Sequence, residues 1–273
     1  MTHSILYKNH RIHVSVEGKG ESIVFLHGWP MHSGLWKAQV EHLKADYRVI
    51  TLDWLGFGQS DKPKDLPYTF TQHKECLDAV LTSVLGEEEK VTLVGHDIGG
   101  PPAILWASEH PNRVRRLILL NTVVYLFKTP LDMLSELALE TPILRDIFVS
   151  RLGLYIVMKI LSRNRSKETK ERLQEVIRPY KELKSEVKWK TILLPLKVGR
   201  QEEMVALSNQ FKELKIDKHI IIARKDPLCY AHIKRLSEDN PEVPTHFIEH
   251  SGHFISIDRP KELNKVLTEI LAK

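Results

Sequence analysis

The sequence GHDIGG at residues 95–100 carries the most information about the fold of this chain. It follows the apolar run 91–94 and precedes a helix-like segment at residues 103–109. A strand, a tight glycine-rich turn and a helix form the setting of a nucleophile elbow, usually written G-x-S-x-G. The central position here is Asp97. The pattern therefore predicts a carboxylate nucleophile that forms an ester with a substrate carbon.

On both sides of this turn, short apolar runs alternate with helix-like segments. We expect strands at residues 12–16, 23–26, 48–52, 91–94, 117–120, 219–223 and 245–248, and helices at residues 35–44, 70–85, 103–109 and 260–271. Short apolar runs suit strands that are buried on both faces of a parallel sheet. The alternation predicts an α/β fold with a mostly parallel, doubly wound sheet.

The pattern changes between about residues 131 and 187, where Leu- and Lys-rich helical segments dominate. The simplest architecture is a helical cap at residues 127–197, inserted after the sixth strand, with a core of residues 1–126 and 198–273. Residues 159–200 hold thirteen Lys or Arg and five Glu, which we interpret as a solvated helical surface. No nucleic-acid motif accompanies this charge, so no nucleic-acid partner is expected.

The overall composition is typical of a globular protein, with 42% hydrophobic and 27% charged residues and a net charge of +5. The two cysteines, Cys76 and Cys229, do not suggest a disulfide framework and favour a reducing compartment such as the cytoplasm. The N-terminal residues do not resemble a secretory signal. No apolar stretch reaches about 18 residues, so we expect no membrane span.

Two further catalytic candidates follow predicted strands later in the chain. Asp226 lies in ARKDPL at residues 223–228, and His253 lies in SGHF at residues 251–254. Each residue alone is equally typical of an ordinary turn or loop. However, the chain order of nucleophile, acid and histidine, each after a predicted strand, favours a catalytic triad at the carboxyl edge of the sheet.

A covalent two-step mechanism follows from these residues. Asp97 attacks without a base, because an ordinary aspartate has a pKa of about 3.9 and is ionised at pH 7. His253 then activates a water against the ester, and Asp226 orients His253. The backbone N–H groups of Trp29, in HGWP at residues 27–30, and of Ile98 are expected to stabilise the oxyanion.

These motifs resemble the α/β-hydrolase superfamily over nearly the full chain, and most of all its branch with an Asp nucleophile. The segment LDWLGFGQSDKP at residues 52–63 is similar to the one after the fourth strand in that branch. Residues 27–30 resemble its H-G-x-P motif, residues 95–100 its G-H-D-x-G-G elbow, and residues 192–196 the end of a dehalogenase cap. The branch contains haloalkane dehalogenases and epoxide hydrolases.

The residue after the nucleophile separates these activities. In the resembled families, haloalkane dehalogenases place Trp there to hold the halide and fluoroacetate dehalogenases place Arg, whereas this chain has Ile98. Epoxide hydrolases instead use cap tyrosines as acids. The candidates here are Tyr155 and Tyr180, with Tyr125 ranked below them, and each could equally be a packing residue.

We therefore expect a small organic substrate and, first, a hydrolase that opens epoxides to diols. The second reading is a haloalkane dehalogenase with an altered halide site. The third is a hydrolase-fold binding protein with little turnover. No metal-ligand spacing or phosphate-binding loop is evident, so we expect no metal and no cofactor. The sequence leaves the oligomeric state open.

Overall fold

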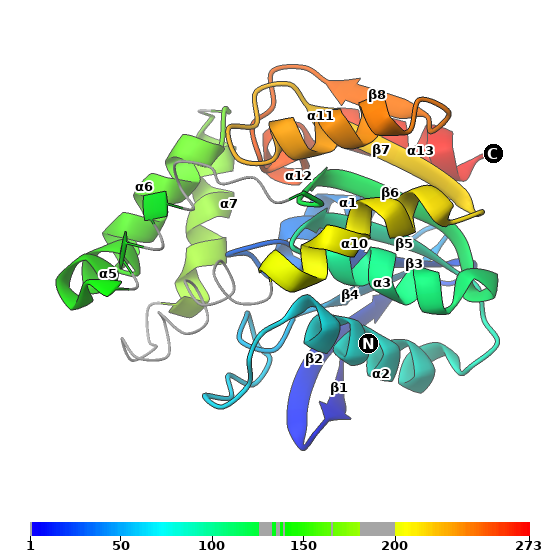
Figure 1. Ribbon diagram of the computed structural model, residues 1–273, viewed down its shortest axis with the longest axis horizontal. Coiled ribbons are helices and arrows are strands. Elements are labelled where there is room, and N and C mark those ends of the chain that lie inside the picture. The colour runs from blue at the N-terminus through cyan, green and yellow to red at the C-terminus, as the bar shows by residue number, and fades with distance from the viewer. Residues whose placement is uncertain (1, 126–132, 135–136, 139, 165, 181–199) are drawn as a thin grey trace.

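A computed structural model of the protein describes residues 2–125, 133–134, 137–138, 140–164, 166–180 and 200–273. At its centre is an eight-stranded sheet with the order β1-β2-β4-β3-β5-β6-β7-β8 (Figure 1). The strands are β1 (Thr2–Tyr7), β2 (His10–Glu17), β3 (Ser22–Leu26), β4 (Arg48–Leu52), β5 (Val91–Asp97), β6 (Val114–Thr122), β7 (Asp217–Ala223) and β8 (Thr245–Ile248). The β1–β2 and β2–β4 pairs are antiparallel, and the other neighbours are parallel.

The predicted α/β-hydrolase architecture is confirmed by this mostly parallel sheet. Strands β3 and β5 are buried along their whole length, as expected for apolar strands covered on both faces. Their parallel register pairs Leu26 with Gly95. The loop after β3 and the turn after β5 therefore leave the sheet side by side, and the next strand pairs Thr122 with Asp97.

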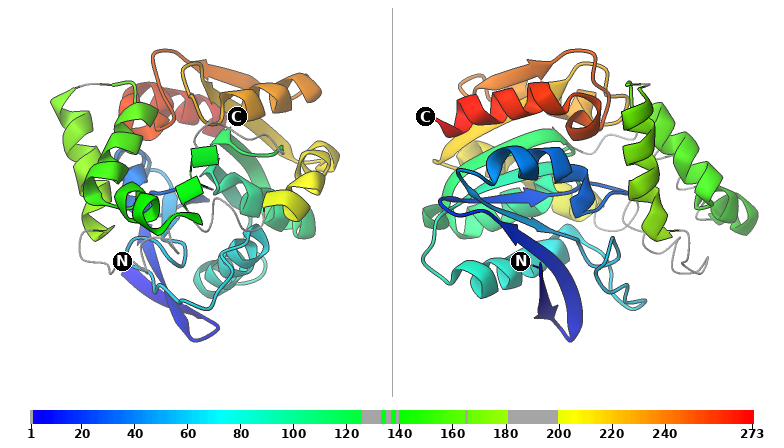
Figure 2. Two further views of the ribbon diagram at one scale, coloured as in Figure 1. Left: turned by 60° about the vertical axis from the view of Figure 1, so that its left-hand side comes forward. Right: turned by 180° about the vertical axis from the view of Figure 1, so that it is seen from behind.

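Helices cover both faces of the sheet. Figure 2, right, shows α1 (Lys37–Leu43) and α13 (Pro260–Leu271) together on one face, where they are in contact with each other. The opposite face carries α2 (Phe70–Leu85), α3 (Gly100–Glu109), α10 (Arg200–Glu213) and α11 (Tyr230–Asp239) (Figure 1). Short helices complete the core: η1 (Ser33–Trp36), η2 (Pro111–Arg113) and α12 (Ile255–Asp258).

Three of the longer elements of the core were not anticipated from the sequence. Strand β1 is an edge strand whose residues are largely exposed, so it lacks the apolar alternation by which strands are recognised. Helices α10 and α11 have polar compositions with negative mean hydropathy. The buried residues of α11 form a narrow stripe of His232, Ile233 and Leu236. The existence of both helices depends on packing against α3 and against β6 and β7.

A group of helices follows the sixth strand and lies beyond one end of the sheet, at the left of Figure 1. It contains α5 (Pro142–Phe148), α6 (Arg151–Leu161), α7 (Lys167–Ile177) and η3 (Arg178–Tyr180). Serine N-caps begin two of them, because the Ser150 and Ser166 side chains accept hydrogen bonds from the backbone N–H of Gly153 and Thr169. The predicted cap end at residues 192–196 lies outside the described residues. Within the described part of the chain, no helix is both long and apolar enough to cross a bilayer.

Candidate active site

Asp97 is the last residue of β5 and lies in the left-handed region of backbone space, at φ +51°. This conformation is costly for a residue with a side chain and is typical of functional turns. Neighbouring contacts hold it in place. The Thr122 hydroxyl donates to the Asp97 carbonyl at 2.6 Å. A Cβ atom at Gly100 would lie 2.0 Å from the Thr122 hydroxyl oxygen, so only glycine permits this close approach.

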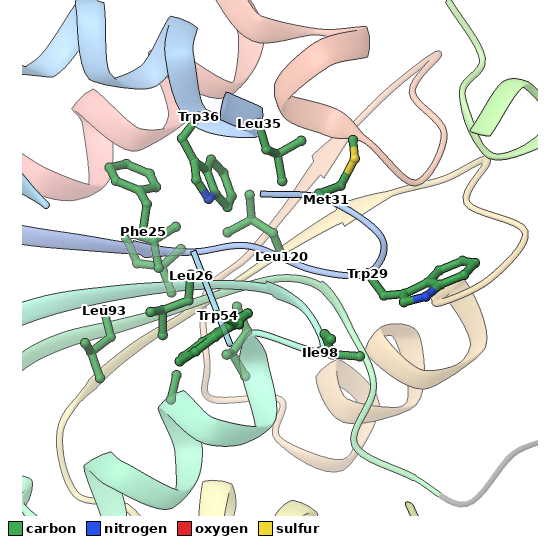
Figure 3. Close-up of a cluster of buried hydrophobic side chains, with 14 of the residues drawn as sticks. Phe25, Leu26, Trp29, Met31, Leu35, Trp36, Trp54, Leu93, Ile98 and Leu120 are labelled. Atoms are coloured by element: carbon green, nitrogen blue, oxygen red, sulfur yellow. The ribbon is translucent and has the colours of Figure 1, made fainter. Parts of the chain in front are cut away.

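One oxygen of the Asp97 carboxylate is held by the loop after β3. The Trp29 backbone N–H donates to Asp97 Oδ2 at 2.7 Å, and both residues are buried. The other expected donor, the N–H of Ile98, belongs to the residue directly after Asp97. Figure 3 shows Trp29 and Ile98 at the same side of the buried cluster, away from Phe25. The Ile98 side chain is buried and apolar, so it can offer a leaving group no hydrogen bond.

Asp53 fixes the loop that carries Trp29, a role the sequence analysis did not assign. Its carboxylate accepts hydrogen bonds from the backbone N–H of Ser33 and Gln59, both at 2.7 Å. Burial opposes ionisation, but His32, His27 and these N–H groups outweigh it and hold the pKa of Asp53 below its usual value. The ionised carboxylate therefore ties the loop after β3 to the loop after β4.

His253 and Asp226 form the pair that the sequence predicts. His253 Nδ1 lies 3.0 Å from Asp226 Oδ2, and both side chains are buried. The second Asp226 oxygen accepts from the N–H groups of Leu228 and Cys229 at 2.8 and 3.1 Å. Burial alone would lower the pKa of His253, but the charge and hydrogen bond of Asp226, with the charge of Asp97, raise it above its usual value.

The other nitrogen of the imidazole points toward Asp97. His253 Nε2 is 3.9 Å from Asp97 Oδ2, too far for a direct hydrogen bond. Three residues from three loops, after β5, β7 and β8, thus converge at the carboxyl edge of the sheet. Such convergence at this edge is the usual location of a site in α/β proteins.

Asn121 and His96 hold the histidine loop from behind. The Asn121 amide donates to the His253 carbonyl at 3.1 Å, and its oxygen accepts from the Ala223 N–H at 2.9 Å. His96 Nε2 lies 2.9 Å from the same His253 carbonyl. The sequence analysis missed Asn121. A polar residue directly after the apolar run at residues 117–120 was the available signal.

Asp258 is another residue that the sequence analysis missed, and it joins the end of α6 to the histidine loop. It accepts hydrogen bonds from the Ser162 hydroxyl, from the Arg163 N–H at 2.9 Å and from the Gly252 N–H at 2.8 Å. The His253 N–H also donates to the Leu161 carbonyl at 2.8 Å. The end of α6 and the residues around His253 are therefore one hydrogen-bonded unit.

The three candidate tyrosines lie in different places. The buried Tyr180 hydroxyl donates to the Pro30 carbonyl at 2.9 Å, in the loop that holds Asp97. Burial and then the Asp53 charge raise the Tyr180 pKa well above its usual value. The Tyr125 hydroxyl instead donates to Asp239 of α11 at 2.6 Å. Tyr155 lines a separate cap cavity of about 290 Å³ with Arg151, Leu152 and Gln174.

A larger cavity of about 430 Å³ opens between helices α5 and α6 and the loop that follows Asp226. Its lining is apolar: Leu134, Ala138, Leu144, Ile147, Phe148, Gly153, Ile156, Val157, Ile160, Leu161, Pro227 and Leu228. Leu228 donates its N–H to Asp226, and Leu161 accepts from His253. The cavity can therefore take an apolar group against the backbone that holds the triad.

Comparison with known proteins identifies the family. The sequence model described as alpha/beta hydrolase fold matches residues 21–260. The chain belongs to the α/β-hydrolase fold family. Solved structures of α/β hydrolases superpose on the whole protein. An esterase from Exiguobacterium antarcticum has a TM-score of 0.82 at 22% identity and covers all of both chains. An epoxide hydrolase has a TM-score of 0.78 at 21% identity and covers 100% of this chain and 98% of its own.

Sequence relatives of this α/β hydrolase match part of the chain. A cis-3-alkyl-4-alkyloxetan-2-one decarboxylase from Shewanella oneidensis is 38% identical over 122 residues, which are 44% of this chain and 38% of that enzyme. A haloalkane dehalogenase from Agrobacterium fabrum is 37% identical over 114 residues, 42% of this chain and 36% of that enzyme. The chain thus aligns with less than two fifths of the length of these curated relatives. The predicted resemblance to this branch is confirmed at that level.

Proposed function

We propose that this α/β hydrolase cleaves an alkyl carbon–oxygen bond through a covalent ester on Asp97, and that its first substrate class is apolar epoxides. One observation carries the covalent part of the proposal. Asp97 Oδ2 accepts a hydrogen bond from the Trp29 N–H at 2.7 Å, and the same oxygen lies 3.9 Å from His253 Nε2. An ionised carboxylate beside an oxyanion donor and a base is suited to both steps of the reaction.

In the first step, an Asp97 oxygen attacks an epoxide carbon, the C–O bond of the ring breaks, and the ring oxygen takes up a proton. In the second, His253 removes a proton from water as the water oxygen attacks the Asp97 carboxyl carbon. The oxyanion then forms on Asp97 and is held by the N–H groups of Trp29 and Ile98; one such donor contributes about 3–4 kcal/mol. Collapse of this intermediate expels the alkoxide of the diol, which takes the proton held by His253. The Asp97 carboxyl group then loses its proton to the solvent, from which the acid of the first step is reprotonated. Asp226 stabilises His253 while it is protonated.

The choice of an epoxide rests on the surroundings of Asp97. Ile98 offers a halide no side-chain donor, which disfavours a halide leaving group. Tyr180, like any tyrosine, bears a proton at neutral pH, and its hydroxyl contacts the Pro30 carbonyl of the loop that holds Asp97. A small rotation of its hydroxyl toward substrate would supply the proton for the ring oxygen. The apolar cavity beside Leu228 favours alkyl substituents.

Two other electrophiles have specific support. Relatives named haloalkane dehalogenase favour a carbon–halogen bond, cleaved by the same attack from Asp97. Relatives named cis-3-alkyl-4-alkyloxetan-2-one decarboxylase act on another strained oxygen ring with alkyl substituents. The deciding assay compares diol formation from a terminal alkyl epoxide, halide release from a bromoalkane of equal chain length, and consumption of a dialkyl oxetan-2-one. The epoxide proposal would be overturned if halide release from the bromoalkane were the fastest of the three reactions, or if the oxetan-2-one were the only substrate consumed.

Trapping the ester tests the covalent step. His253→Gln should permit attack by Asp97 but slow hydrolysis of the ester, so intact mass spectrometry should show the protein with one substrate added. His3→Gln, at an exposed position of β1, is the matched control and should show no adduct at steady state. A single turnover of the unaltered enzyme in ¹⁸O-labelled water should place the label in Asp97. Label in the first diol instead would exclude the ester, and tight binding without turnover would support a binding protein.

Replacing Tyr180 tests whether this residue is the acid that protonates the epoxide oxygen. Tyr180→Phe should lower kcat for epoxides about 10²–10⁴-fold, the usual contribution of a positioned acid. It should affect bromoalkanes little, since a halide leaves without a proton. Tyr155→Phe is the control, because Tyr155 lines the separate cap cavity. Equal loss on both substrate classes would mean that Tyr180 only supports the loop at Pro30.

A further inference from the structure

Three metal-ligating side chains meet at the nucleophile. Cys229 Sγ lies 3.7 Å from Asp97 Oδ1, and His253 Nε2 lies 3.9 Å from Asp97 Oδ2. One ligand atom from each of the three residues lies within 4.8 Å of the other two, and all three residues are buried. Ligands of a tetrahedral zinc ion, bound at about 2.0–2.3 Å, lie roughly 3.3–3.8 Å from one another. Small side-chain movements would bring these three to that spacing.

The histidine gives an independent indication of a ligand. His253 is fully buried, yet within the described part of the chain its Nε2 has no hydrogen-bond partner. Its Nδ1 faces Asp226 at 3.0 Å. A carboxylate on one imidazole nitrogen is the usual way in which proteins orient the other nitrogen toward a metal. Asp226 would orient the His253 ring toward a bound metal in the same way as it orients the ring toward Asp97.

The position of Cys229 suits a thiolate ligand. Cys229 is the N-cap residue of the ten-residue helix α11, and the positive end of a helix dipole stabilises a thiolate. Its backbone N–H is bonded to Asp226 at 3.1 Å, so the cysteine is held on the same carboxylate that orients His253. Sulfur, nitrogen and carboxylate oxygen together are the donor set that zinc prefers.

We propose that Asp97, Cys229 and His253 form a site for a thiophilic divalent cation, Zn²⁺, whose binding blocks the nucleophile and the base at once. Binding releases the thiol proton of Cys229 to the solvent. The charges of the Asp97 carboxylate, the Cys229 thiolate and Zn²⁺ then sum to zero around a neutral His253, which favours binding at a buried position. Asp97 Oδ2 can keep its bond to Trp29 while Oδ1 binds the metal. A water molecule would be the fourth ligand of a tetrahedral ion.

The binding test needs no substrate. Co²⁺ added to the full chain after removal of metals by chelation should give a sulfur-to-metal charge-transfer band, with roughly tetrahedral visible bands that Zn²⁺ abolishes. The band requires a cysteine ligand, and the chain has two cysteines. Cys229→Ala should abolish it. Cys76→Ala, at a buried cysteine of α2, should leave it unchanged. No band in the unaltered protein, or a band that persists in Cys229→Ala, would overturn the proposal.

A second variant removes another ligand without touching sulfur. His253→Gln should weaken Co²⁺ binding by at least about 10–100-fold. That is the loss in affinity typical when a metal ligand loses its outer hydrogen-bond partner. Far-ultraviolet circular dichroism checks that both variants fold. Unchanged Co²⁺ affinity in a folded His253→Gln protein would count against the site.

The inhibitory part rests on the proposed function. Zn²⁺ should lower turnover of the best substrate at least tenfold, reversibly by chelation, and Cys229→Ala should lose this inhibition relative to its own metal-free rate. If no substrate turns over, the proposed function fails while the Co²⁺ band still decides the site. Zn²⁺ inhibition that is equal in Cys229→Ala would place the metal elsewhere.

Discussion

At the scale of single residues, the site depends on how closely two loops approach. Gly28, beside Trp29, leaves so little space that a Cβ atom there would lie 2.4 Å from Asp97 Cβ and 2.8 Å from its Oδ2. Gly28→Ala must therefore displace the Asp97 side chain. We expect kcat to fall about 100-fold or more, since a displacement of about 1 Å can cost that much. Stability should fall by about 1–3 kcal/mol through overpacking.

Gly86→Ala is the matched control for this residue-scale prediction. Gly86 ends α2 with φ +75°, and a Cβ there would meet no atom within 4 Å. Its backbone strain should cost about 1–2 kcal/mol and leave kcat unchanged. Steady-state kinetics and urea unfolding of both variants give the comparison. A Gly28→Ala enzyme with the kcat of the unaltered protein would show that the loop can yield.

At the scale of elements, Asp258 of α12 connects the end of α6 to the histidine loop. Asp258→Asn removes a buried charge that accepts from Ser162, Arg163 and Gly252. We expect a loss of about 1.5–3 kcal/mol for a hydrogen bond to a charged group. The value of kcat should also fall, because the His253 N–H bonds the same stretch of cap at Leu161. Thermal unfolding and kinetics measure both effects.

The exposed Asp46 supplies the control for this element, since Asp46→Asn should change stability by no more than about 0.5 kcal/mol. Loss of stability in Asp258→Asn with normal kcat would show that the connection between cap and loop is structural only.

At the scale of the whole molecule, buried neutral histidines predict sensitivity to acid. Burial lowers the pKa of His73 to about 3 and that of His27 to about 4. Below pH 6.5 the unfolded chain binds protons that the folded protein does not, so stability falls as the pH falls toward the folded pKa values. Through His73 alone, going from pH 6.5 to 4.5 should cost about 2–3 kcal/mol.

His73→Phe should remove the part of the acid-induced loss of stability that comes from His73. The ring would keep its packing against Trp54, whose centroid lies 4.9 Å away. Urea unfolding at pH 6.5 and 4.5 measures the difference, with the exposed His3→Gln as control. If His73→Phe loses as much stability on acidification as the unaltered protein, His73 is not the group that titrates.

Much of this fold was predictable because its signals are local. The apolar composition of the runs that form β3 to β8 indicates that these strands are buried. The glycines around Asp97 indicate the tight turn. Strand β1 and helices α10 and α11 were not predictable. Their stability comes from pairing and packing with residues far along the chain, which no local pattern records.

The sequence by itself determined which residues stand at the ends of parallel strands, and hence that Asp97, Asp226 and His253 share one edge of the sheet. Parallel strands of one sheet align their carboxyl ends, so chain order is enough for that conclusion. Only the tertiary structure decided what surrounds them. Asn121, Cys229 and Asp258 take part in the site through contacts with residues far along the chain. These contacts depend on loop geometry and close packing rather than on spacing in the sequence.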